Sequence, residues 1–253
     1  MNTSAALPLA GKSVLLTGAA RRLGATMARA FHANGANVAI HYRSSTAAAE
    51  ALVAELNAAR PGSAIALQAN LLEVVEVPGL VTRVVEDLGR LDILVNNAST
   101  FYPTPVGEIT LAQWDDLVGT NLRAPLFLSQ AAAPQLRLHS GLILNMIDIH
   151  AQRPLKRHPV YCVAKAGLAM LTRSLARELG PHVRVNGIAP GPVLWPEGDI
   201  DGDLKGRIID RTALKRPGSP DDIARAALYF AKDAPYVTGQ ILAIDGGRSV
   251  GSA

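Results

Sequence analysis

The chain has 253 residues, of which 49% are hydrophobic and 18% are charged, a composition typical of one large globular α/β domain. The net charge of +4 includes no dense run of lysine or arginine, which argues against nucleic-acid binding. The single cysteine, Cys162, excludes an intrachain disulfide framework. We see neither a secretory signal nor an apolar run near the roughly 18 residues that span a bilayer, so we expect a cytoplasmic protein.

Short apolar segments alternate with longer segments of helical spacing along the chain. The expected strands are 13–17, 37–42, 64–68, 91–97, 142–146, 183–188 and 241–245. The expected helices are 23–34, 46–59, 74–88, 111–134, 160–179 and 219–232. Strands that are apolar on both faces and separated by helices predict a parallel sheet covered on both sides. We therefore expect one Rossmann-type, doubly wound α/β domain of about seven strands over residues 1–253.

The segment 190–217 interrupts this alternation with two stretches rich in proline and glycine, PGPVLWPEG and KRPGSP. We expect a loop region with one short helix, of the kind that covers a binding site. Trp195 lies in this region, and it could close over a substrate or pack between subunits.

The first predicted strand leads directly into TGAARRLG, residues 17–24. Ligands of open parallel sheets bind at the carboxyl ends of the strands, where a helix N-terminus favours a pyrophosphate. Gly18 permits a tight turn, and Gly24 permits close approach of the helix to the strand. Arg22 stands where such a turn usually has its middle glycine, and it could reach phosphate oxygens or a substrate. The turn predicts a dinucleotide site.

The end of the second predicted strand indicates which dinucleotide is bound. NAD sites usually place an acidic residue about 20 residues after the glycines, to hold the ribose 2′-hydroxyl. This chain has HYRSS at 41–45 and no acid. Arg43, the hydroxyls of Ser44 and Ser45, and the N-terminus of the next helix suit a 2′-phosphate, although either serine could simply cap that helix. We therefore predict NADPH rather than NADH.

Tyr161 and Lys165 are four residues apart and so share one face of the predicted helix 160–179. A phenol with a pKa near ~10 transfers protons poorly at neutral pH. We expect the lysine ammonium to lower the pKa of the tyrosine and to hold the ribose hydroxyls beside the nicotinamide.

Together these motifs resemble the short-chain dehydrogenase/reductase family over nearly the whole chain. The segments that carry the resemblance are TGAARRLG, NNAS at 96–99, Asn121, YCVAK at 161–165, PG at 190–191 and DGG at 245–247. Within that family, TGAARRLG, HYRSS, NNASTFYPTP and an aspartate thirteen residues before the tyrosine, Asp148, resemble the pteridine reductases.

The resemblance implies a catalytic set of Asp148, Tyr161, Lys165 and Asn121, the last as a helix-bending residue whose backbone holds a water on the proton path. A serine hydroxyl usually occupies the place of Asp148 and suits a carbonyl substrate. A carboxyl group can instead accept hydrogen bonds from the N–H groups of a pterin and pass a proton through Tyr161. A degenerate site with a solvated aspartate is the alternative.

The resemblance also implies which residues line the site. The cofactor set is Gly18, Arg22, Leu23, Gly24, His41, Tyr42, Arg43, Ser44, Asn70, Leu71, Asn97, Ala98, Ser99, Tyr161, Lys165, Pro190 and Gly191. The substrate set is Arg22, Ser99, Phe101, Asp148 and Tyr161.

Aromatic and histidine side chains near the motifs have less certain roles. A flat pterin could be sandwiched between Phe101 and the nicotinamide, whereas Tyr102 could simply anchor its loop. His150, His158 and Cys162 have no metal-ligand constellation around them. We expect no metal and interpret all three as structural or substrate-rim residues.

The resemblance implies NADPH-dependent reduction of pterins or dihydropterins, such as dihydrobiopterin, dihydromonapterin or dihydrofolate, to the tetrahydro form. A 3-oxoacyl or other carbonyl reductase is the main alternative, against which Asp148, Phe101 and Arg22 argue. A catalytically silent NADPH-binding sensor is the third interpretation, which the intact Tyr161 and Lys165 disfavour.

Members of the family are usually tetramers that assemble through two long helices, here 111–134 and 160–179, and through C-terminal contacts. The resemblance therefore implies a homotetramer. Arg248 in the C-terminal tail could approach the site of a neighbouring subunit.

Overall fold

A seven-stranded parallel sheet organises the computed structural model, which describes residues 7–195 and 202–250. The strand order is β3-β2-β1-β4-β5-β6-β7. The strands are β1 (Ser13–Leu16), β2 (Asn37–Tyr42), β3 (Ala64–Gln68), β4 (Ile93–Asn96), β5 (Leu142–Met146), β6 (Arg184–Pro190) and β7 (Ile241–Ile244). The chain order reverses between β1 and β4, which confirms the predicted doubly wound α/β fold.

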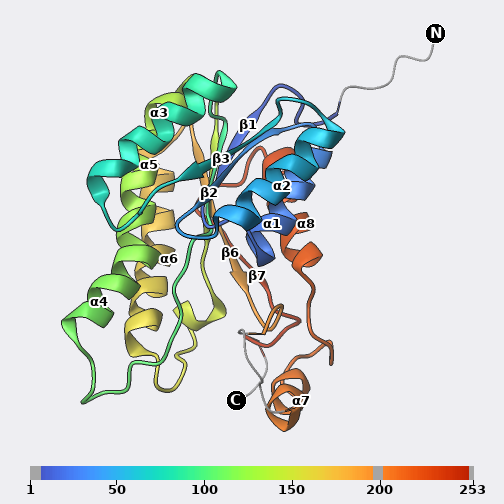
Figure 1. Ribbon diagram of the computed structural model, residues 1–253. Helices are drawn as coiled ribbons and strands as arrows, with labels where there is room; N and C mark the ends of the chain where they lie inside the picture. The colour runs from blue at the N-terminus through green and yellow to red at the C-terminus, as the bar shows by residue number, and fades with distance from the viewer. Residues whose placement is uncertain (1–6, 196–201, 251–253) are drawn as a thin grey trace.

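Helices cover both faces of this sheet. They are α1 (Arg22–Ala33), α2 (Thr46–Ala59), α3 (Val77–Leu88), α4 (Leu111–Val118), α5 (Ala124–Leu138), α6 (Pro159–Leu179), α7 (Gly202–Asp210) and α8 (Pro220–Lys232). Figure 1 shows α3, α4, α5 and α6 on one side of the sheet and α1, α2 and α8 on the other. The short helix expected within 190–217 is α7, and residues 196–201 of that region lie outside the described residues.

The predicted helix 111–134 is wrong in one respect, because the structure divides it. A π-helical turn, Gly119–Arg123, separates α4 from α5, and α5 continues to Leu138. The side chain of Asn121 donates to the main-chain carbonyl of Leu117 at 2.9 Å and to that of Thr100 at 3.0 Å. A side-chain amide that donates to the carbonyl four residues earlier competes with the main-chain hydrogen bonds of the helix. The helix therefore widens at this point.

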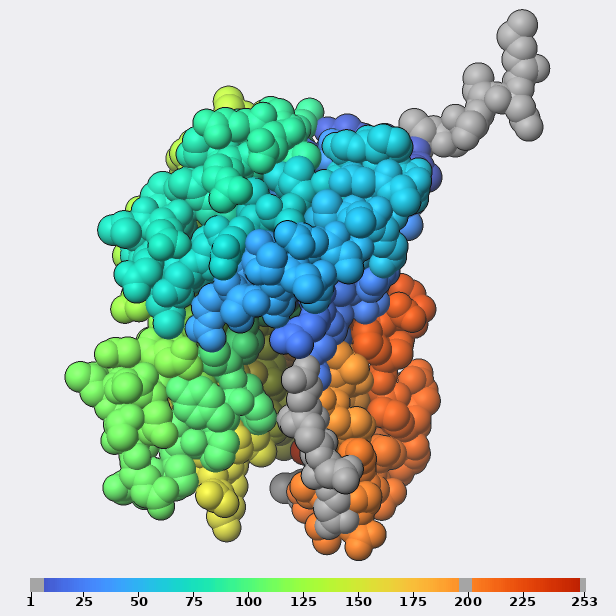
Figure 2. Space-filling model, viewed as in Figure 1, coloured from blue at the N-terminus to red at the C-terminus, as the bar shows by residue number. Residues whose placement is uncertain are grey.

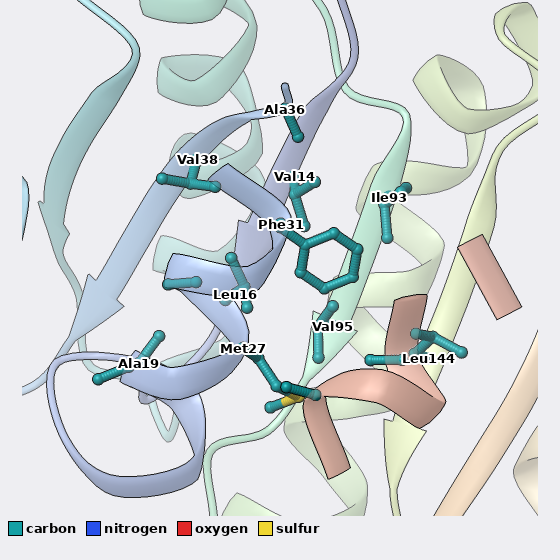
Figure 3. Packing of buried hydrophobic residues seen from close by; sticks show 14 of the residues in the cluster. Val14, Leu16, Ala19, Met27, Phe31, Ala36, Val38, Ile93, Val95 and Leu144 are labelled. Carbon is teal, nitrogen blue, oxygen red and sulfur yellow. The ribbon is translucent and has the colours of Figure 1, made fainter. Parts of the chain in front are cut away.

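The core beneath α1 fixes that helix on the sheet. Phe31 and Met27 lie four residues apart on one face of α1 and are fully buried against Val14 and Leu16 of β1 and Val95 of β4 (Figure 3). Burying a large apolar side chain contributes about 1.5–3 kcal/mol. The N-terminus of α1 is thereby held at the carboxyl ends of β1 and β4.

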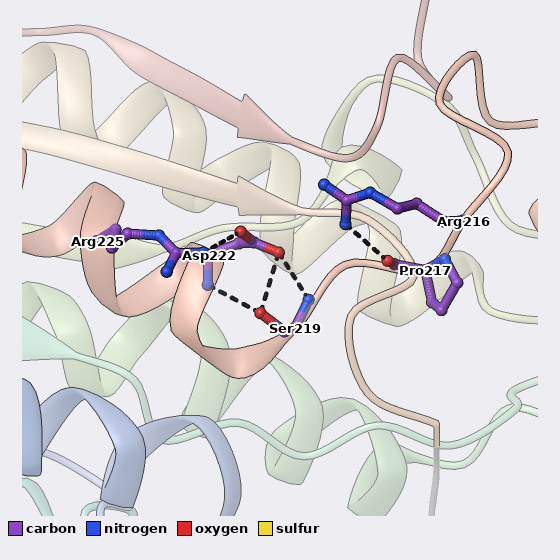
Figure 4. Close-up of polar contacts among 5 residues, drawn as sticks. All are labelled: Arg216, Pro217, Ser219, Asp222 and Arg225. Atoms are coloured by element: carbon purple, nitrogen blue, oxygen red, sulfur yellow. Dashed lines mark hydrogen bonds and ion pairs between the residues drawn. The ribbon is translucent and has the colours of Figure 1, made fainter.

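The KRPGSP stretch ends in a capping box that starts α8 (Figure 4). The Ser219 hydroxyl accepts the Asp222 N–H at 3.3 Å, and the Asp222 carboxylate accepts the Ser219 N–H at 2.8 Å. Arg225 pairs with the same carboxylate at 2.6 Å. The Ser219 N–H and the Arg225 guanidinium hold the pKa of Asp222 below its usual value. These bonds fix where the long loop rejoins the regular fold.

None of the described helices is both long enough and apolar enough to cross a membrane.

Candidate active site

A cleft of about 830 Å³ opens at the carboxyl ends of the strands. Figure 2 shows the molecule hollowed between the green and orange segments, beneath the blue N-terminal part. The cleft lies at the reversal of strand order, which is where doubly wound folds bind ligands. We call the part around Gly18, His41 and Arg43 the nucleotide end, and the part around Asp148 and Tyr161 the tyrosine end.

The cleft brings together almost all of the residues that the sequence predicts for the site. From the predicted cofactor and substrate sets, it is lined by Gly18, Arg22, Leu23, Gly24, His41, Tyr42, Arg43, Ser44, Asn70, Leu71, Asn97, Ala98, Ser99, Phe101, Asp148, Tyr161, Lys165, Pro190 and Gly191. Asn121 is the exception, because it is buried behind Ser99.

The turn after β1 requires its two glycines. A Cβ on Gly18 would lie 2.8 Å from the Cα of Ala98, and Gly18 has a φ of +59°. A Cβ on Gly24 would lie 2.5 Å from the Cα of Ala19. Real Cβ atoms do not approach main-chain atoms so closely, so any other residue would open the turn.

The same turn is tied to the end of β4. The Thr17 hydroxyl accepts the N–H groups of Asn97 and Ala98 at 2.9 and 3.0 Å. The Asn97 amide donates to the carbonyls of Thr17 and Gly18 at 2.9 and 3.0 Å. No side chain caps the first turn of α1, and that turn contains no acidic residue. A rigid turn below an uncapped helix N-terminus fits a pyrophosphate group.

His41 braces the nucleotide end from below. Its Nδ1 accepts the Gly18 N–H at 3.1 Å, so its Nε2 carries the proton and donates to the carbonyl of Ala69 at 3.1 Å. Burial lowers the pKa of His41 to about 4, which keeps the ring neutral at physiological pH. We predicted His41 as a cofactor residue, and both of its ring nitrogens engage main-chain groups of the site.

The corner at the end of β2 suits an anion. Arg43 and Ser44 are exposed, and Ser45 is the N-cap of α2 without making a side-chain capping bond. The first turn of α2 has no acidic residue. A cation, two hydroxyls and a helix N-terminus therefore converge where the sequence predicts a 2′-phosphate.

The tyrosine end contains a hydrogen-bonded pair. The Tyr161 hydroxyl donates to Oδ2 of Asp148 at 2.8 Å, and Oδ1 of Asp148 accepts the His150 N–H at 2.8 Å. Lys165 Nζ donates to the main-chain carbonyl of Met146 at 2.8 Å and lies 5.6 Å from the centre of the Tyr161 ring. Both Tyr161 and Lys165 are buried, although they line the cleft.

The predicted lowering of the Tyr161 pKa is wrong in direction. Burial, followed by the neighbouring Asp148 carboxylate, raises the pKa of Tyr161 well above its usual value. Burial also lowers the pKa of Lys165 to about 8, against the opposing effect of Asp148. The sequence spacing shows that the two groups share a helix face, but it does not show their desolvation. Tyr161 is therefore arranged as a proton donor.

Asn121 supports this end from behind. Its Oδ1 accepts the Ser99 hydroxyl at 2.6 Å, while its amide donates to Thr100 and Leu117. The residue thus joins the loop after β4 to the π-helical turn. Its predicted backbone role in holding a water stays a prediction.

Phe101 stands at the mouth of the tyrosine end, with 43% of its surface exposed. Its ring is nearly perpendicular to that of Tyr161, with centroids 4.9 Å apart. It stacks on the imidazole of His158 at 4.7 Å, with an angle of 11° between the planes. One face of Phe101 is therefore covered by His158, a contact that was not predicted from the sequence.

Tyr102 and Cys162 have structural contacts. The Tyr102 hydroxyl donates to the carboxylate of Asp116 at 2.9 Å, and burial followed by that carboxylate raises the pKa of Tyr102 to about 12. This bond anchors the loop, which is the role that the sequence suggested for Tyr102. The Cys162 thiol accepts the Leu155 N–H at 3.3 Å.

The region after β6 closes one side of the cleft. The Arg22 guanidinium donates to the main-chain carbonyl of Trp195 at 2.7 Å. Trp195 lines the cleft of its own chain, and so does Arg248. Four further apolar side chains that were not predicted from the sequence also line the cleft: Leu155, Leu194, Leu204 and Ile208. The four-residue spacing of Leu204 and Ile208 is the one sequence signal that could have indicated part of this set.

Within residues 7–195 and 202–250, no group of three or more His, Cys, Asp or Glu side chains could hold a metal ion.

Comparison with known proteins identifies the family of this fold and cleft. A family model described as enoyl-(acyl carrier protein) reductase matches residues 18–249. Pteridine reductase 1 of Leishmania tarentolae is 36% identical, with 99% of each chain covered. The 3-oxoacyl-[acyl-carrier-protein] reductase FabG of Staphylococcus aureus (strain Mu50 / ATCC 700699) is 37% identical over 93% of this chain and 97% of that protein.

Two solved structures have the same fold as this chain. A blue fluorescent protein from a metagenomic library, in complex with NADPH, superimposes with a TM-score of 0.89 at 34% identity, covering 95% of this chain and 99% of that one. A dehydrogenase/reductase from Sinorhizobium meliloti 1021 gives 0.90 at 35% identity, covering 96% and 97%. The chain belongs to the short-chain dehydrogenase/reductase family. It is an oxidoreductase whose cleft binds a nicotinamide cofactor.

Proposed function

We propose that the protein uses NADPH to reduce the ring of a pteridine, either a dihydropterin or an oxidised pterin, to the tetrahydro form. The observation that carries the proposal is the Asp148 carboxylate inside the cleft, hydrogen-bonded to the Tyr161 hydroxyl at 2.8 Å. A carbonyl group has no N–H that could donate a hydrogen bond to this carboxylate. A pterin offers both N–H donors and ring nitrogens that must gain a proton, so it suits an acceptor beside a proton donor.

The nucleotide end supports NADPH over NADH. Arg43, Ser44 and Ser45 surround the N-terminus of α2, and no acid stands at the end of β2 to hold a free ribose hydroxyl. An acid there would repel a 2′-phosphate, whereas Arg43 can donate two parallel hydrogen bonds to it.

The side chains at the tyrosine end have separate roles in the proposed reaction. The bound NADPH supplies the hydride. Tyr161, whose raised pKa keeps it protonated, is the proton donor for an oxidised ring, and Asp148 orients both the hydroxyl and the substrate. Phe101 offers an aromatic surface beside Tyr161, and stacking on it is worth about 0.5–1.5 kcal/mol beyond burial. For a dihydropterin, water can supply the proton directly, without Tyr161 as the donor.

Steady-state kinetics test the proposal. NADPH consumption should be measured with biopterin, dihydrobiopterin, dihydromonapterin, dihydrofolate and an acetoacetyl thioester, and again with NADH in place of NADPH. We expect turnover of at least one pteridine with NADPH, and little turnover of the thioester. Turnover of the thioester alone would make the protein a carbonyl reductase, and turnover of no substrate would favour the sensor interpretation.

We also propose that the protein is a cytoplasmic homotetramer. Three apolar side chains, Leu126 of α5 and Val163 and Met170 of α6, have 38%, 53% and 59% of their surface exposed. Exposed apolar side chains on neighbouring helices support an interface between copies of the chain. Light scattering during size-exclusion chromatography measures the assembled mass, and a monomeric mass would contradict the tetramer.

A further inference from the structure

A buried polar side chain lies directly behind the tyrosine end of the cleft. Asn145 of β5 is fully buried, and it immediately precedes Met146, whose carbonyl accepts the hydrogen bond from Lys165 Nζ. A buried amide destabilises the core unless its donors and acceptors are satisfied. Asn145 is not among the residues that line the cleft, so any part it has in the chemistry is exerted through its neighbours.

Both ends of the Asn145 amide have partners on adjacent elements. Its Oδ1 accepts a hydrogen bond at 2.8 Å from Nδ2 of Asn96, the residue beside it on β4. Its Nδ2 donates to the hydroxyl of Thr172 on α6 at 2.9 Å. That hydroxyl donates in turn to the carbonyl of Leu168, four residues earlier in α6, at 2.8 Å. A continuous chain of hydrogen bonds therefore runs from β4 through β5 into α6.

Thr172 and Lys165 lie on one face of α6, because they are seven residues, or close to two turns, apart. Lys165 binds the carbonyl of Met146, and Thr172 binds the side chain of the preceding residue, Asn145. Two adjacent residues of one strand therefore hold the same helix at two points. Thr172 is fully buried and Lys165 is 2% exposed, so water does not compete for either bond.

The Nζ atom of Lys165 has to be held in place at the tyrosine end. A lysine side chain is flexible, and one hydrogen bond fixes its ammonium only if the helix that carries it is itself fixed. A shift of α6 along β5 would change both the bond to Met146 and the 5.6 Å separation of Nζ from the centre of the Tyr161 ring. Since a misplacement of about 1 Å can slow a reaction about 100-fold, the position of α6 matters for the chemistry.

We propose that Asn145 and Thr172 are positioning residues, which fix α6 against β5 and thereby hold the Lys165 ammonium at the Met146 carbonyl beside Tyr161. Neither side chain touches a substrate or a cofactor, and both act through Lys165. This role does not depend on a pteridine, because the same lysine and tyrosine would serve a carbonyl substrate.

Nuclear magnetic resonance of the lysine ¹³Cε signals tests this role without any substrate. Lys165→Met identifies the signal of Lys165 by its loss. Burial lowers the pKa of Lys165 to about 8 in the wild type. Thr172→Val keeps the shape of the side chain but removes the hydroxyl, so the ammonium should lose part of its bond to the carbonyl, which favours the charged form. We therefore expect the pKa of Lys165 to fall further, by about 0.5 or more.

The sign of this change separates positioning from a general loosening of the core. If Thr172→Val merely admits water around α6, the pKa of Lys165 should rise toward its usual value of 10.5, because hydration favours the ammonium. A rise, or an unchanged pKa, would overturn the proposal. Thr172→Ser keeps the hydroxyl and should restore the wild-type value. Thr172→Ala removes the same hydroxyl and leaves the Asn145 amide more room, so it replaces Thr172→Val if that variant does not fold.

Steady-state kinetics give a second readout. Thr172→Val should lower kcat about tenfold with dihydrobiopterin, or with the acetoacetyl thioester if that is the compound reduced, while KM stays within about twofold. Thr172→Ser should recover most of the loss. If the wild type reduces neither compound, the proposed function fails, whereas the resonance measurement still decides the role of Thr172.

Two matched variants remove hydroxyls that make the same local bond elsewhere. The buried Ser129 of α5 and the exposed Thr82 of α3 each donate to the carbonyl four residues earlier, at 2.7 and 3.1 Å. Ser129→Ala should lower the free energy of unfolding without changing kcat, and Thr82→Val should change neither. A kcat of Thr172→Val within twofold of the wild type, or an equal fall of kcat in Ser129→Ala, would overturn the proposed positioning.

Discussion

The nucleotide end and the tyrosine end of one cleft are built in different ways. The nucleotide end is made of main-chain contacts: Gly18 and Gly24 pack against backbone, and His41 joins two strand ends. The tyrosine end is made of side chains that come from distant segments, such as Asp148, Tyr161 and Arg248. A cofactor shared by a whole family needs a constant backbone, whereas substrate choice can change through a few side chains. Substitutions at the two ends test this division, beginning with the one of largest expected effect.

The largest effect is expected at the proton donor. Tyr161→Phe removes the hydroxyl that Asp148 holds, so the kcat for an oxidised pterin should fall about 10²- to 10⁴-fold. Dihydropterin reduction should suffer less if water supplies its proton. Fluorescence titration should show an NADPH affinity close to that of the wild type. Undiminished turnover of oxidised pterin would remove Tyr161 from the donor role.

The buried, neutral His41 at the nucleotide end predicts that the stability of the protein depends on pH. The pKa of His41 is lowered from 6.5 to about 4, so between these values the unfolded chain binds a proton that the folded chain does not. The free energy of unfolding should therefore fall as the pH is lowered through this window, by about 3 kcal/mol from this residue.

Denaturant unfolding from pH 7 to pH 4 measures this contribution. His41→Asn can still accept the Gly18 N–H but does not titrate, so its stability should depend less on pH than that of the wild type. His182→Asn changes an exposed histidine and serves as the matched control. Equal pH dependence of stability in the wild type and His41→Asn would contradict the contribution assigned to His41.

A third prediction separates the two ends directly. Asp148→Ser restores the hydroxyl that suits a carbonyl, so kcat/KM for pteridines should fall about 10- to 100-fold, the loss expected when a charged hydrogen-bond acceptor is removed. The dissociation constant of NADPH should stay within about twofold, because Asp148 lies at the tyrosine end. A parallel loss of cofactor affinity would show that the ends are not independent.

The smallest effect is expected at the 2′-phosphate corner. Arg43→Gln should weaken NADPH binding about tenfold while leaving NADH binding nearly unchanged. The loss should shrink at high salt, because Arg43 is exposed. Arg83→Gln removes an exposed arginine from α3 and is the control for net charge. Equal weakening of both cofactors would contradict the assigned contact.

The sequence predicted the strands and the nucleotide end well because both depend on local patterns. Apolar runs and the glycine turn can be recognised within a few residues of chain. The break at Asn121 was missed because it depends on a bond to Thr100 in another loop. The direction of the Tyr161 pKa was wrong because burial by the surrounding fold and the Asp148 carboxylate both raise it. No spacing rule shows either of these tertiary effects.

The tyrosine end could be predicted only in part for the same reason. Asp148 and Phe101 were identified through resemblance to known reductases. The stacking of Phe101 on His158 depends on how two loops meet. Arg248 reaches the cleft of its own chain because the Asp245 turn packs against the residues after α7, a contact between segments far apart in the sequence.

The central claim is that this cleft transfers hydride from NADPH to a pteridine ring. The most direct measurement mixes the protein with limiting NADPH and excess dihydrobiopterin or dihydrofolate, then quantifies NADPH loss and tetrahydropteridine formation in the same sample. We predict one tetrahydropteridine formed for each NADPH consumed with at least one of the two substrates. Unchanged NADPH, or NADPH consumed without a tetrahydropteridine product, would contradict the account.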